Sequence, residues 1–473
     1  MTTPAEQQID RLFIDLCGCE CPGLLALGAN GSNRRYWRIR DIFPCIAAYN
    51  EDVRENEAFF YYSKALRERG IHVPLVYAIS EDRRYYLQQD LGDTTLYSYM
   101  YDKKRQGGGF DAEMLALYKQ VLGDLAEMQV AGRDLDFTKA YPRSSFDAQS
   151  IQWDLNYFKY YFLKTRYVPF DEELLEKDFH TLTRYLTEAD CGYFLYRDFQ
   201  SRNIMLHDGV PYYIDFQGGR RGAAQYDVAS LLYSAKSNLP EVIRQELLTH
   251  YIECLSKLVT VDTRLFRQHF YAYVMIRIMQ AMGAYGYRGY FEKKDYFISS
   301  IPLAINNLRL VMEQHPLDID IPHLRQVWKY IADSAEAATP ASASTSGLTV
   351  TVTSFSYRKG LPQDSTGNGG GYIFDCRALP NPGRYPEYRC YTGKDQPVIT
   401  FLKKEDSVGQ FLNAAEEMVG ASIHKYMERN FTHLSVAFGC TGGQHRSVYC
   451  AECMAKWIFD NFDCQVVVIH REQ

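Results

Sequence analysis

The sequence lacks the features that mark a membrane protein, a secreted protein or a strongly charged binder. No apolar run approaches the roughly 20 residues that cross a membrane. Residues 1–20 have neither a basic leader nor the apolar core of a signal peptide. The formal net charge is only −6, which disfavours a general nucleic-acid or membrane-surface binder. We therefore expect a cytoplasmic protein with no membrane partner.

Two familiar phosphate-binding features are also absent. No GxxxxGK[ST] motif occurs, which argues against a P-loop nucleotide-binding domain. The first lysine of the chain is Lys64, so the preceding residues contain no lysine that would contact a nucleotide.

The cysteines do not have the density of a disulfide scaffold. There are 12 in 473 residues, and several lie in apolar, helix-like segments that a cytoplasm would keep reduced. Cys17, Cys19 and Cys21 form a CxCxC run without a nearby histidine or a second pair at zinc spacing. This pattern favours idle thiols over a metal site.

The composition is that of a globular chain with more than one domain. Apolar residues make up 46% of 473 residues, and charged residues 23%. Residues 332–347 consist almost entirely of Ala, Ser, Thr and Pro, which predicts a flexible linker. Before it, residues 1–97 have a strand-rich pattern and residues 98–331 a helical one, which predicts a two-lobed α+β domain. After it, residues 348–473 alternate strand and helix patterns, which predicts a small α/β domain with some parallel pairing.

The sharpest chemical pattern in the first domain surrounds Asp198. Asn203 follows five residues later, and a Tyr-Ile-Asp-Phe segment then carries Asp215. Phosphoryl transfer needs one carboxylate to accept the proton of the nucleophile and oxygen ligands to hold Mg²⁺ on the triphosphate. The spacing therefore predicts Asp198 as the catalytic base, with Asn203 and Asp215 as the metal ligands.

These motifs resemble the aminoglycoside-phosphotransferase and choline-kinase family, which shares the protein-kinase fold. The resemblance runs over residues 10–330 and is strongest toward the anomeric kinases for N-acetylmuramate and N-acetylglucosamine. The segments that carry it are NGSNRRYWRI (30–39), ENEAF (55–59), VPLVYA (73–78), LQQDLGDTTL (87–96), YRDFQSRNIML (196–206) and YYIDFQGGRRGAAQYDVASLLY (212–233).

The resemblance implies ATP and Mg²⁺ as cofactors and an amino sugar as the small-molecule substrate. It also implies a phosphate-covering loop and an adenine hinge, which would bind the nucleotide through Gly28, Asn30, Gly31, Ser32, Asn33, Arg34, Gln88, Gln89, Asp90 and Leu91.

One departure from the family concerns its strand lysine, which this chain lacks. A guanidinium also matches phosphate, so Arg34, Arg35 or Arg38 are the alternatives to that lysine. The competing interpretation is a degenerate kinase lobe in a sensor or adaptor protein. The base and both metal ligands are present, which favours activity.

The acceptor is expected beside Asp198, next to the helix that carries Trp153, Asp154 and Tyr157. Aromatic residues at this helical spacing usually form core, while sugar stacking is the functional alternative. Asp154 is a candidate ligand for sugar hydroxyl groups.

The second chemical pattern follows an apolar strand and opens a helix. Glycines at a helix N-terminus present backbone amides to an anion, and an arginine and a histidine add positive charge. The pattern predicts a phosphate or sugar-phosphate site made by Cys440, Thr441, Gly442, Gly443, His445, Arg446 and Ser447. The spacing Cys-x5-Arg-Ser is also that of a cysteine phosphatase, in which the thiolate attacks phosphorus.

Residues 348–473 resemble the C-terminal domain of the RNase-adapter protein RapZ, through SFSYRKGLP (354–362), FDCRALPNPG (374–383), YTGKDQPV (391–398) and FGCTGGQHRSVY (438–449). The resemblance implies a regulatory domain that binds glucosamine 6-phosphate. RNA, which that family also implies, is the less favoured partner here, because 13 basic residues balance 13 acidic ones in this range. We expect a kinase joined to a domain that binds an amino-sugar phosphate as effector.

Overall fold

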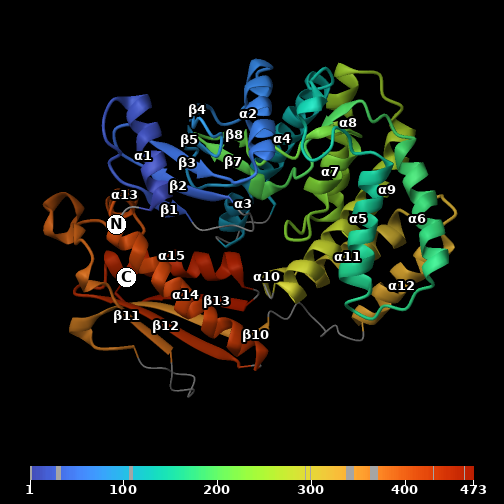
Figure 1. Ribbon diagram of the computed structural model, residues 1–473. Coiled ribbons are helices and arrows are strands. Elements are labelled where there is room, and N and C mark those ends of the chain that lie inside the picture. Colours follow the sequence, from blue (N-terminus) through green and yellow to red (C-terminus); the bar gives the residue numbers. More distant parts are fainter. Residues whose placement is uncertain are drawn as a thin grey trace. The chain divides into compact units, whose positions relative to one another are not determined.

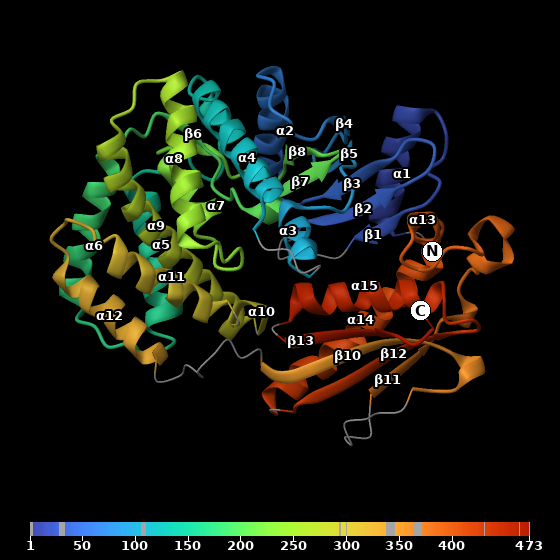
Figure 2. The same cartoon turned by 180° about the vertical axis from the view of Figure 1, so that it is seen from behind.

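The computed structural model describes residues 3–27, 34–105, 110–292, 295–298, 300–336, 346–362, 371–429, 431–462 and 464–472. The chain divides into two compact units. The first consists of Met1–Lys293 with Ser300–Ala337, and the second of Lys294–Ser299 with Ala338–Gln473. The predicted α+β fold class is confirmed, and each unit is described by itself below (Figures 1 and 2).

The first unit begins with a small lobe built on an antiparallel sheet. Its five strands lie in the order β1-β2-β3-β5-β4. Helix α2 connects β3 to β4, and helix α1 packs against β4 and β5. The elements are α1 (Pro4–Cys17), β1 (Leu25–Leu27), β2 (Arg35–Ile39), β3 (Cys45–Tyr49), α2 (Val53–Glu68), β4 (Val76–Ile79) and β5 (Tyr85–Gln89).

Helix α2 begins where Asp52 caps it. The Asp52 carboxylate accepts hydrogen bonds from the backbone amides of Arg54 and Glu55, which have no partner inside the helix. Asn50, just before the cap, donates from its side chain to Glu55 at 2.8 Å. The first turn of α2, and with it Glu55, is therefore held in place from the end of β3.

The second lobe of this unit is helical and carries two short antiparallel hairpin-like pairs, β6 with β9 and β7 with β8. Its helices are α3 (Leu96–Arg105), α4 (Ala112–Ala131), α5 (Ala148–Phe158), α6 (Glu172–Thr187), α7 (Gln225–Leu232), α8 (Glu241–Leu258), α9 (Thr263–Gly286), α11 (Ile301–Gln314) and α12 (Pro322–Glu336). Its strands are β6 (Tyr193–Leu195), β7 (Ile204–His207), β8 (Val210–Tyr213) and β9 (Arg220–Gly222). The short helices of this lobe are η1 (Phe137–Lys139), η2 (Lys159–Leu163), η3 (Ser201–Asn203) and η4 (Tyr287–Phe291), while α10 (Asp295–Ile298) belongs to the second unit.

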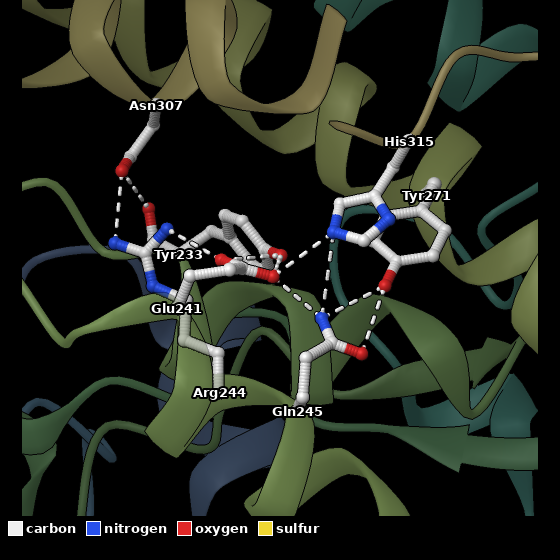
Figure 3. A network of polar contacts seen from close by, with 7 residues as sticks. All are labelled: Tyr233, Glu241, Arg244, Gln245, Tyr271, Asn307 and His315. Carbon is white, nitrogen blue, oxygen red and sulfur yellow. Dashed lines mark hydrogen bonds and ion pairs between the residues drawn. The ribbon is translucent and has the colours of Figure 1, made fainter. Parts of the chain in front are cut away.

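A polar network ties the end of α7 to α8, α9 and α11 (Figure 3). Glu241 lies at its centre and accepts from Tyr233 and Gln245, and it lies 3.0 Å from the His315 ring. The His315 ring stacks on Tyr271, with ring centroids 4.0 Å apart. Because buried polar groups need partners, this network fixes the positions of α7, α8, α9 and α11 relative to one another.

The second unit is built on a four-stranded sheet in the order β11-β12-β10-β13, and every neighbouring pair is parallel. Helices α14 and α15 pack against β10 and β12. The elements are β10 (Ser346–Ser356), η5 (Tyr357–Lys359), β11 (Gly371–Asp375), η6 (Cys376–Ala378), η7 (Pro382–Arg384), η8 (Pro386–Tyr388), α13 (Gln396–Lys403), α14 (Asp406–Glu428), β12 (His433–Cys440), α15 (Arg446–Asn461) and β13 (Cys464–His470). In an open parallel sheet, ligands bind at the carboxyl ends of the strands, where Asp375 and Cys440 lie.

The segment predicted to be a linker, 332–347, overlaps secondary structure at both ends. Helix α12 continues to Glu336 and β10 begins at Ser346, while residues 337–345 lie outside the described part of the chain. Alanine has the strongest helix propensity, which explains why α12 extends into an Ala-rich stretch. None of the helices in the described ranges is both long and apolar enough to cross a membrane.

Candidate functional sites

The structure brings the three residues predicted for phosphoryl transfer into one site. Asp198 lies in the loop after β6, Asn203 ends η3, and Asp215 follows β8. The Asn203 side chain donates to the backbone carbonyl of Asp198 at 2.8 Å and to the Asp215 carboxylate at 3.2 Å. The amide oxygen of Asn203 and the carboxylate of Asp215 are the hard oxygen ligands that Mg²⁺ binds.

The charges around Asp215, a residue that remains exposed to solvent, fit a bound cation. Desolvation by the surrounding protein and the nearby negative charge of Asp198 raise the pKa of the Asp215 carboxyl, while the Gln217 side chain opposes this by donating to it at 2.7 Å. Asp215 also has a backbone φ of +70°, a left-handed conformation that costs free energy in a residue other than glycine. The chain holds two carboxylates close together, an arrangement that a divalent cation would stabilise.

Asp227, at the start of α7, is hydrogen-bonded to the chain segment just before Asp198. Its carboxylate accepts from the backbone amides of Tyr196 and Arg197 at 2.8 and 3.0 Å, and from the Gln129 side chain at 3.1 Å. Burial raises the pKa of Asp227 to about 7, although these donors favour the charged form. The Tyr196 hydroxyl donates to the carbonyl of Ile214, so the loop is tied to the chain just before Asp215.

Of the three arginines considered in place of the missing lysine, Arg34 is the one that pairs with Glu55, in the first turn of α2. Its guanidinium is 3.4 Å from Glu55 of α2 and is almost completely buried. Burial alone would lower the pKa of Arg34, but Tyr86, Tyr36 and Glu55 raise it, so the group stays cationic. The positive charge of Arg34 also acts on Asp215, which places it near the metal-ligand pair.

Arg38 and Arg35 have other contacts. The Arg38 guanidinium pairs with Asp90 and Asp93, each at 2.7 Å, and donates to the carbonyl of Gly92 at 3.0 Å. The exposed Arg35 side chain stacks on the Tyr49 ring, with its guanidinium carbon 4.6 Å from the ring centroid. Arg35 also lines a cavity of about 880 Å³ at the start of α2.

The predicted nucleotide-binding residues are only partly described. Gln88 and Gln89 end β5, and Asp90 and Leu91 follow, with Leu91 buried. The carboxylate of Asp90 is occupied by Arg38 and by the backbone amide of Gly92, which rigidify this segment. The loop residues Gly28, Asn30, Gly31, Ser32 and Asn33 lie outside the described residues.

The residues predicted for the acceptor have different environments on α5. Both carboxylate oxygens of Asp154 accept from Arg197 at 2.8 Å, so Asp154 anchors the residue that precedes Asp198. The Trp153 side chain is 49% exposed, and the Arg143 guanidinium lies 5.2 Å from its ring. The Tyr157 ring packs on Tyr161, with centroids 4.9 Å apart.

Three buried residues of this site were not singled out from the sequence. The hydroxyl of Tyr226 accepts from Arg197 and from Arg277, whose other donors reach Ser230 and Gln280. Arg220, on β9, lies in the same cluster. A signal existed for Arg277, which interrupts an otherwise apolar helical stretch.

In the second unit, the predicted anion-binding loop connects β12 to α15. Gly443 has φ +73°, and a Cβ there would lie 2.4 Å from Glu472, so only glycine fits. Thr441 is held through its carbonyl by the Ser356 hydroxyl at 2.7 Å, whereas Gly442 is exposed. The His445 ring donates to the carbonyl of Tyr388 at 3.0 Å.

The thiol of Cys440 lies inside this loop and is only 2% exposed. Its sulfur accepts from the backbone amide of Gly443 and contacts the Ser447 hydroxyl, both at 3.2 Å. Burial by itself raises the pKa of the Cys440 thiol, but the hydrogen bonds from Ser447 and Gly443 and the charge of Arg446 bring it below its ordinary value of 9.0. The loop therefore favours the thiolate.

Arg446 lines a cavity of about 410 Å³, together with Arg377, Arg384 and Thr441. The Arg446 side chain is 5% exposed and donates to the backbone carbonyls of Arg377 and Leu379 at 2.8 and 3.0 Å. Its Nε has no hydrogen-bond partner among the described residues. A buried, incompletely paired guanidinium beside two further arginines is an arrangement that an anion would satisfy.

Comparison with protein families assigns both parts of the chain. Residues 24–259 match the phosphotransferase enzyme family, and residues 348–473 match the RapZ C-terminal domain.

Among the curated relatives, the chain is 38% identical over 157 residues to "Nucleotide-binding protein azo0399" of Azoarcus sp. (strain BH72), covering 33% of this chain and 50% of the relative. It is 42% identical over 127 residues to a "Nucleotide-binding protein" of Dechloromonas aromatica (strain RCB), covering 26% and 42% respectively. The chain thus spans half or less of the length of these relatives.

Among solved structures, similarity extends to LicA in complex with AMP, with 14% identity, a TM-score of 0.45 and coverage of 65% of this chain and 99% of LicA. The amicoumacin kinase hAmiN has 14% identity and a TM-score of 0.45, with coverage of 70% of this chain and 93% of that chain.

Proposed function

We propose that this chain, which joins a phosphotransferase-family domain to a RapZ C-terminal domain, is an ATP- and Mg²⁺-dependent kinase that phosphorylates a hydroxyl group of an amino sugar. The observation that carries the proposal is the convergence of Asp198, Asn203 and Asp215, linked through the Asn203 side chain at 2.8 and 3.2 Å. This arrangement includes an unfavourable backbone conformation at Asp215, which is expected in a functional site and not in a degenerate kinase lobe.

The roles of the residues follow from what phosphoryl transfer requires. Asp198 accepts the proton of the acceptor hydroxyl, and the hydroxyl oxygen forms a bond to the γ-phosphorus of ATP. The bond between the γ-phosphorus and the bridging oxygen of the β-phosphate breaks, which releases ADP. Asn203 and Asp215 would hold Mg²⁺, which neutralises charge on the phosphates when it is bound. Arg34 supplies the fixed cation that other members of the family place on a strand lysine.

The amino-sugar acceptor is supported by the resemblance to the anomeric sugar kinases and by the half-exposed aromatic Trp153 on α5. The test is a coupled assay of the full chain with ATP and magnesium against N-acetylmuramate, N-acetylglucosamine, glucosamine, choline and aminoglycosides. Turnover with one amino sugar and not with choline supports the proposal. Turnover with choline alone would replace the acceptor while leaving the kinase assignment intact.

For the C-terminal domain we propose an amino-sugar phosphate as effector, bound by residues 440–447, with Arg446 as the main cationic group. The support is the cavity lined by Arg377, Arg384 and Arg446. Isothermal titration of the full chain with glucosamine 6-phosphate, followed by kinase kinetics with and without it, tests the binding and the regulation separately. Absence of binding heat would contradict the effector assignment.

A second candidate function, a cysteine-dependent phosphatase, is favoured by one observation: the Cys440 sulfur accepts from Gly443 and contacts Ser447, and its pKa is lowered. In such a reaction the thiolate would attack phosphorus and the bond to the ester oxygen would break, with that oxygen taking a proton from solvent water; a second water would then cleave the phosphorus–sulfur bond, releasing phosphate and the thiol. Hydrolysis of p-nitrophenyl phosphate that Cys440→Ser abolishes would support it. Equal hydrolysis, or none, by both proteins would leave binding as the only role of the loop.

A further inference from the structure

Arg220 is a buried cation with almost no partners. Its side chain lies on β9, opposite Leu195 of β6, and the residue is 7% exposed. Among the described residues it makes one hydrogen bond, from its Nε to the carbonyl of Gly218 at 2.9 Å. A guanidinium has five N–H donors, and the Nη groups of Arg220 have no hydrogen-bond partner among the described residues, so they are available to a ligand.

The neighbouring carboxylates compensate this charge only in part. The guanidinium of Arg220 lies beside Arg197: a Cβ placed on Gly218 would be 3.8 Å from the Arg197 Cβ and 4.0 Å from an Arg220 Nη. Both oxygens of Asp154, the nearest structural acid, are taken by Arg197. Burial and the charge of Arg197 lower the pKa of Arg220 to about 10, as expected where positive charge exceeds negative.

Arg220 is also close to the reacting group. The negative charges of Asp198 and Asp154 both act on it, and Arg220 pairs across the two strands with Leu195, three residues before Asp198. Arg277 adds a third guanidinium to this cluster and donates to Tyr226, Ser230 and Gln280, none of which carries a negative charge. The Arg220 guanidinium is therefore positioned to bind an anion next to Asp198 through two N–H donors.

We propose that Arg220 binds an anionic group, a carboxylate or a phosphate, on the acceptor, so that the substrate of this kinase is an acidic amino sugar rather than a neutral one. The inference rests on the proposed kinase function and adds the charge of its acceptor. A fork-like ion pair next to Asp198 orients the acceptor hydroxyl toward the base.

The test uses two matched pairs of acceptors on the full chain: N-acetylmuramate against N-acetylglucosamine, and glucosamine 6-phosphate against glucosamine. The wild type should prefer the acidic member of at least one pair by about 10- to 100-fold in kcat/KM, which is the range expected for a charged hydrogen-bonded contact. Arg220→Met should remove that preference, because KM should rise at least about tenfold more for the acidic member of a pair than for the neutral one. Arg220→Lys, which keeps the charge but loses the fork, should retain part of the preference.

The matched control is Arg221→Met. Arg221 is the next residue of β9, but its side chain is exposed and lies over the Phe137 ring at 5.0 Å. It should leave the preference unchanged. Thermal denaturation of each variant shows whether it is folded.

Three results would overturn the proposal. The first is equal use of both members of each pair by the wild type, which leaves the kinase standing but removes its preference for acidic acceptors. The second is an equal loss of kcat with both members in Arg220→Met, which would place this guanidinium on the nucleotide phosphates. The third is silence with all four acceptors, together with no binding of N-acetylmuramate to Asp198→Asn by titration calorimetry; glucosamine 6-phosphate is left out of this measurement because it is also the proposed effector of the C-terminal domain.

Discussion

Arg34 and Glu55 form an ion pair, 3.4 Å apart, between the start of β2 and the first turn of α2. The pair favours Arg34 among the three arginines that the sequence left open, since Arg38 is occupied by Asp90 and Asp93. The Asn50 side chain, which donates to Glu55 at 2.8 Å, holds the acid of the pair in position. The chain thus has a cation next to the metal-ligand pair although it has no lysine there.

We predict that Arg34→Met lowers kcat/KM for ATP by about 10- to 100-fold, because a charged contact to the phosphates is lost. Arg34→Lys should recover part of the activity. The measurement is steady-state kinetics with ATP as the varied substrate. Arg35→Met removes the same charge from the next residue of the chain and should have a small effect; a larger loss in Arg35→Met than in Arg34→Met would contradict the assignment.

Arg446→Ala should weaken binding of glucosamine 6-phosphate by about 10-fold or more, because a nearly buried guanidinium beside the 410 Å³ cavity is removed. Titration calorimetry on the full chain measures it. Arg429→Ala is the control, since Arg429 is an exposed arginine after α14 and should bind like the wild type. Unchanged affinity in Arg446→Ala would place the anion elsewhere.

The lowered pKa of Cys440 predicts a pH dependence with a definite sign. Between its lowered value and 9.0, the folded chain binds fewer protons at this thiol than the unfolded chain does. The contribution of Cys440 to stability is therefore present above 9.0 and is lost as the pH falls through the lowered pKa. Urea unfolding of the wild type and of Cys440→Ser across this window should show the difference growing with pH, and the ultraviolet absorbance of the thiolate should titrate below 9.0 only when Cys440 is present. A titration above 9.0 would show that burial outweighs the hydrogen bonds.

Gly286→Ala should destabilise the first unit by about 2 kcal/mol or more, because packing is overfilled. A Cβ at this end of α9 would lie 1.8 Å from the backbone oxygen of Tyr161. Gly123→Ala is the control: its Cβ would meet only the Cys254 sulfur at 3.9 Å, within helix α4, so it should be neutral or stabilising by about 0.5–1 kcal/mol. Chemical denaturation measures the free energy of unfolding of both variants. Equal values would contradict the prediction and would mean that α9 and η2, which carry Gly286 and Tyr161, can move apart.

Local sequence patterns were sufficient where chemistry and structure are close along the chain. The Asp198 to Asn203 spacing predicted two groups of the site, and they are joined by a hydrogen bond at 2.8 Å. The apolar strand before Cys440 and the helix after Arg446 likewise follow the predicted order. Such contacts span few residues, so the pattern alone determines them.

Contacts between distant segments were beyond the sequence. The role of Asp154 depends on Arg197, which lies 43 residues further along the chain, and spacing along α5 contains no information about that pairing. The hydrogen bond from Ser356 to Thr441 spans 85 residues and depends on β10 being the parallel neighbour of β12. The role proposed for Arg220 depends on its burial with a single hydrogen bond, from Nε to the carbonyl of Gly218, which is a property of the folded chain.

The measurement that tests the central claim most directly is ATP-dependent phosphorylation of the amino-sugar panel by the wild type and by Asp198→Asn, with nucleotide binding measured in parallel. We predict turnover by the wild type, a loss of about 10²- to 10⁴-fold in kcat in Asp198→Asn, and ATP affinity that is unchanged, because Asp198 acts on the acceptor proton and not on the nucleotide. Turnover that does not depend on Asp198, or a wild type that neither binds ATP nor phosphorylates any acceptor, would contradict it.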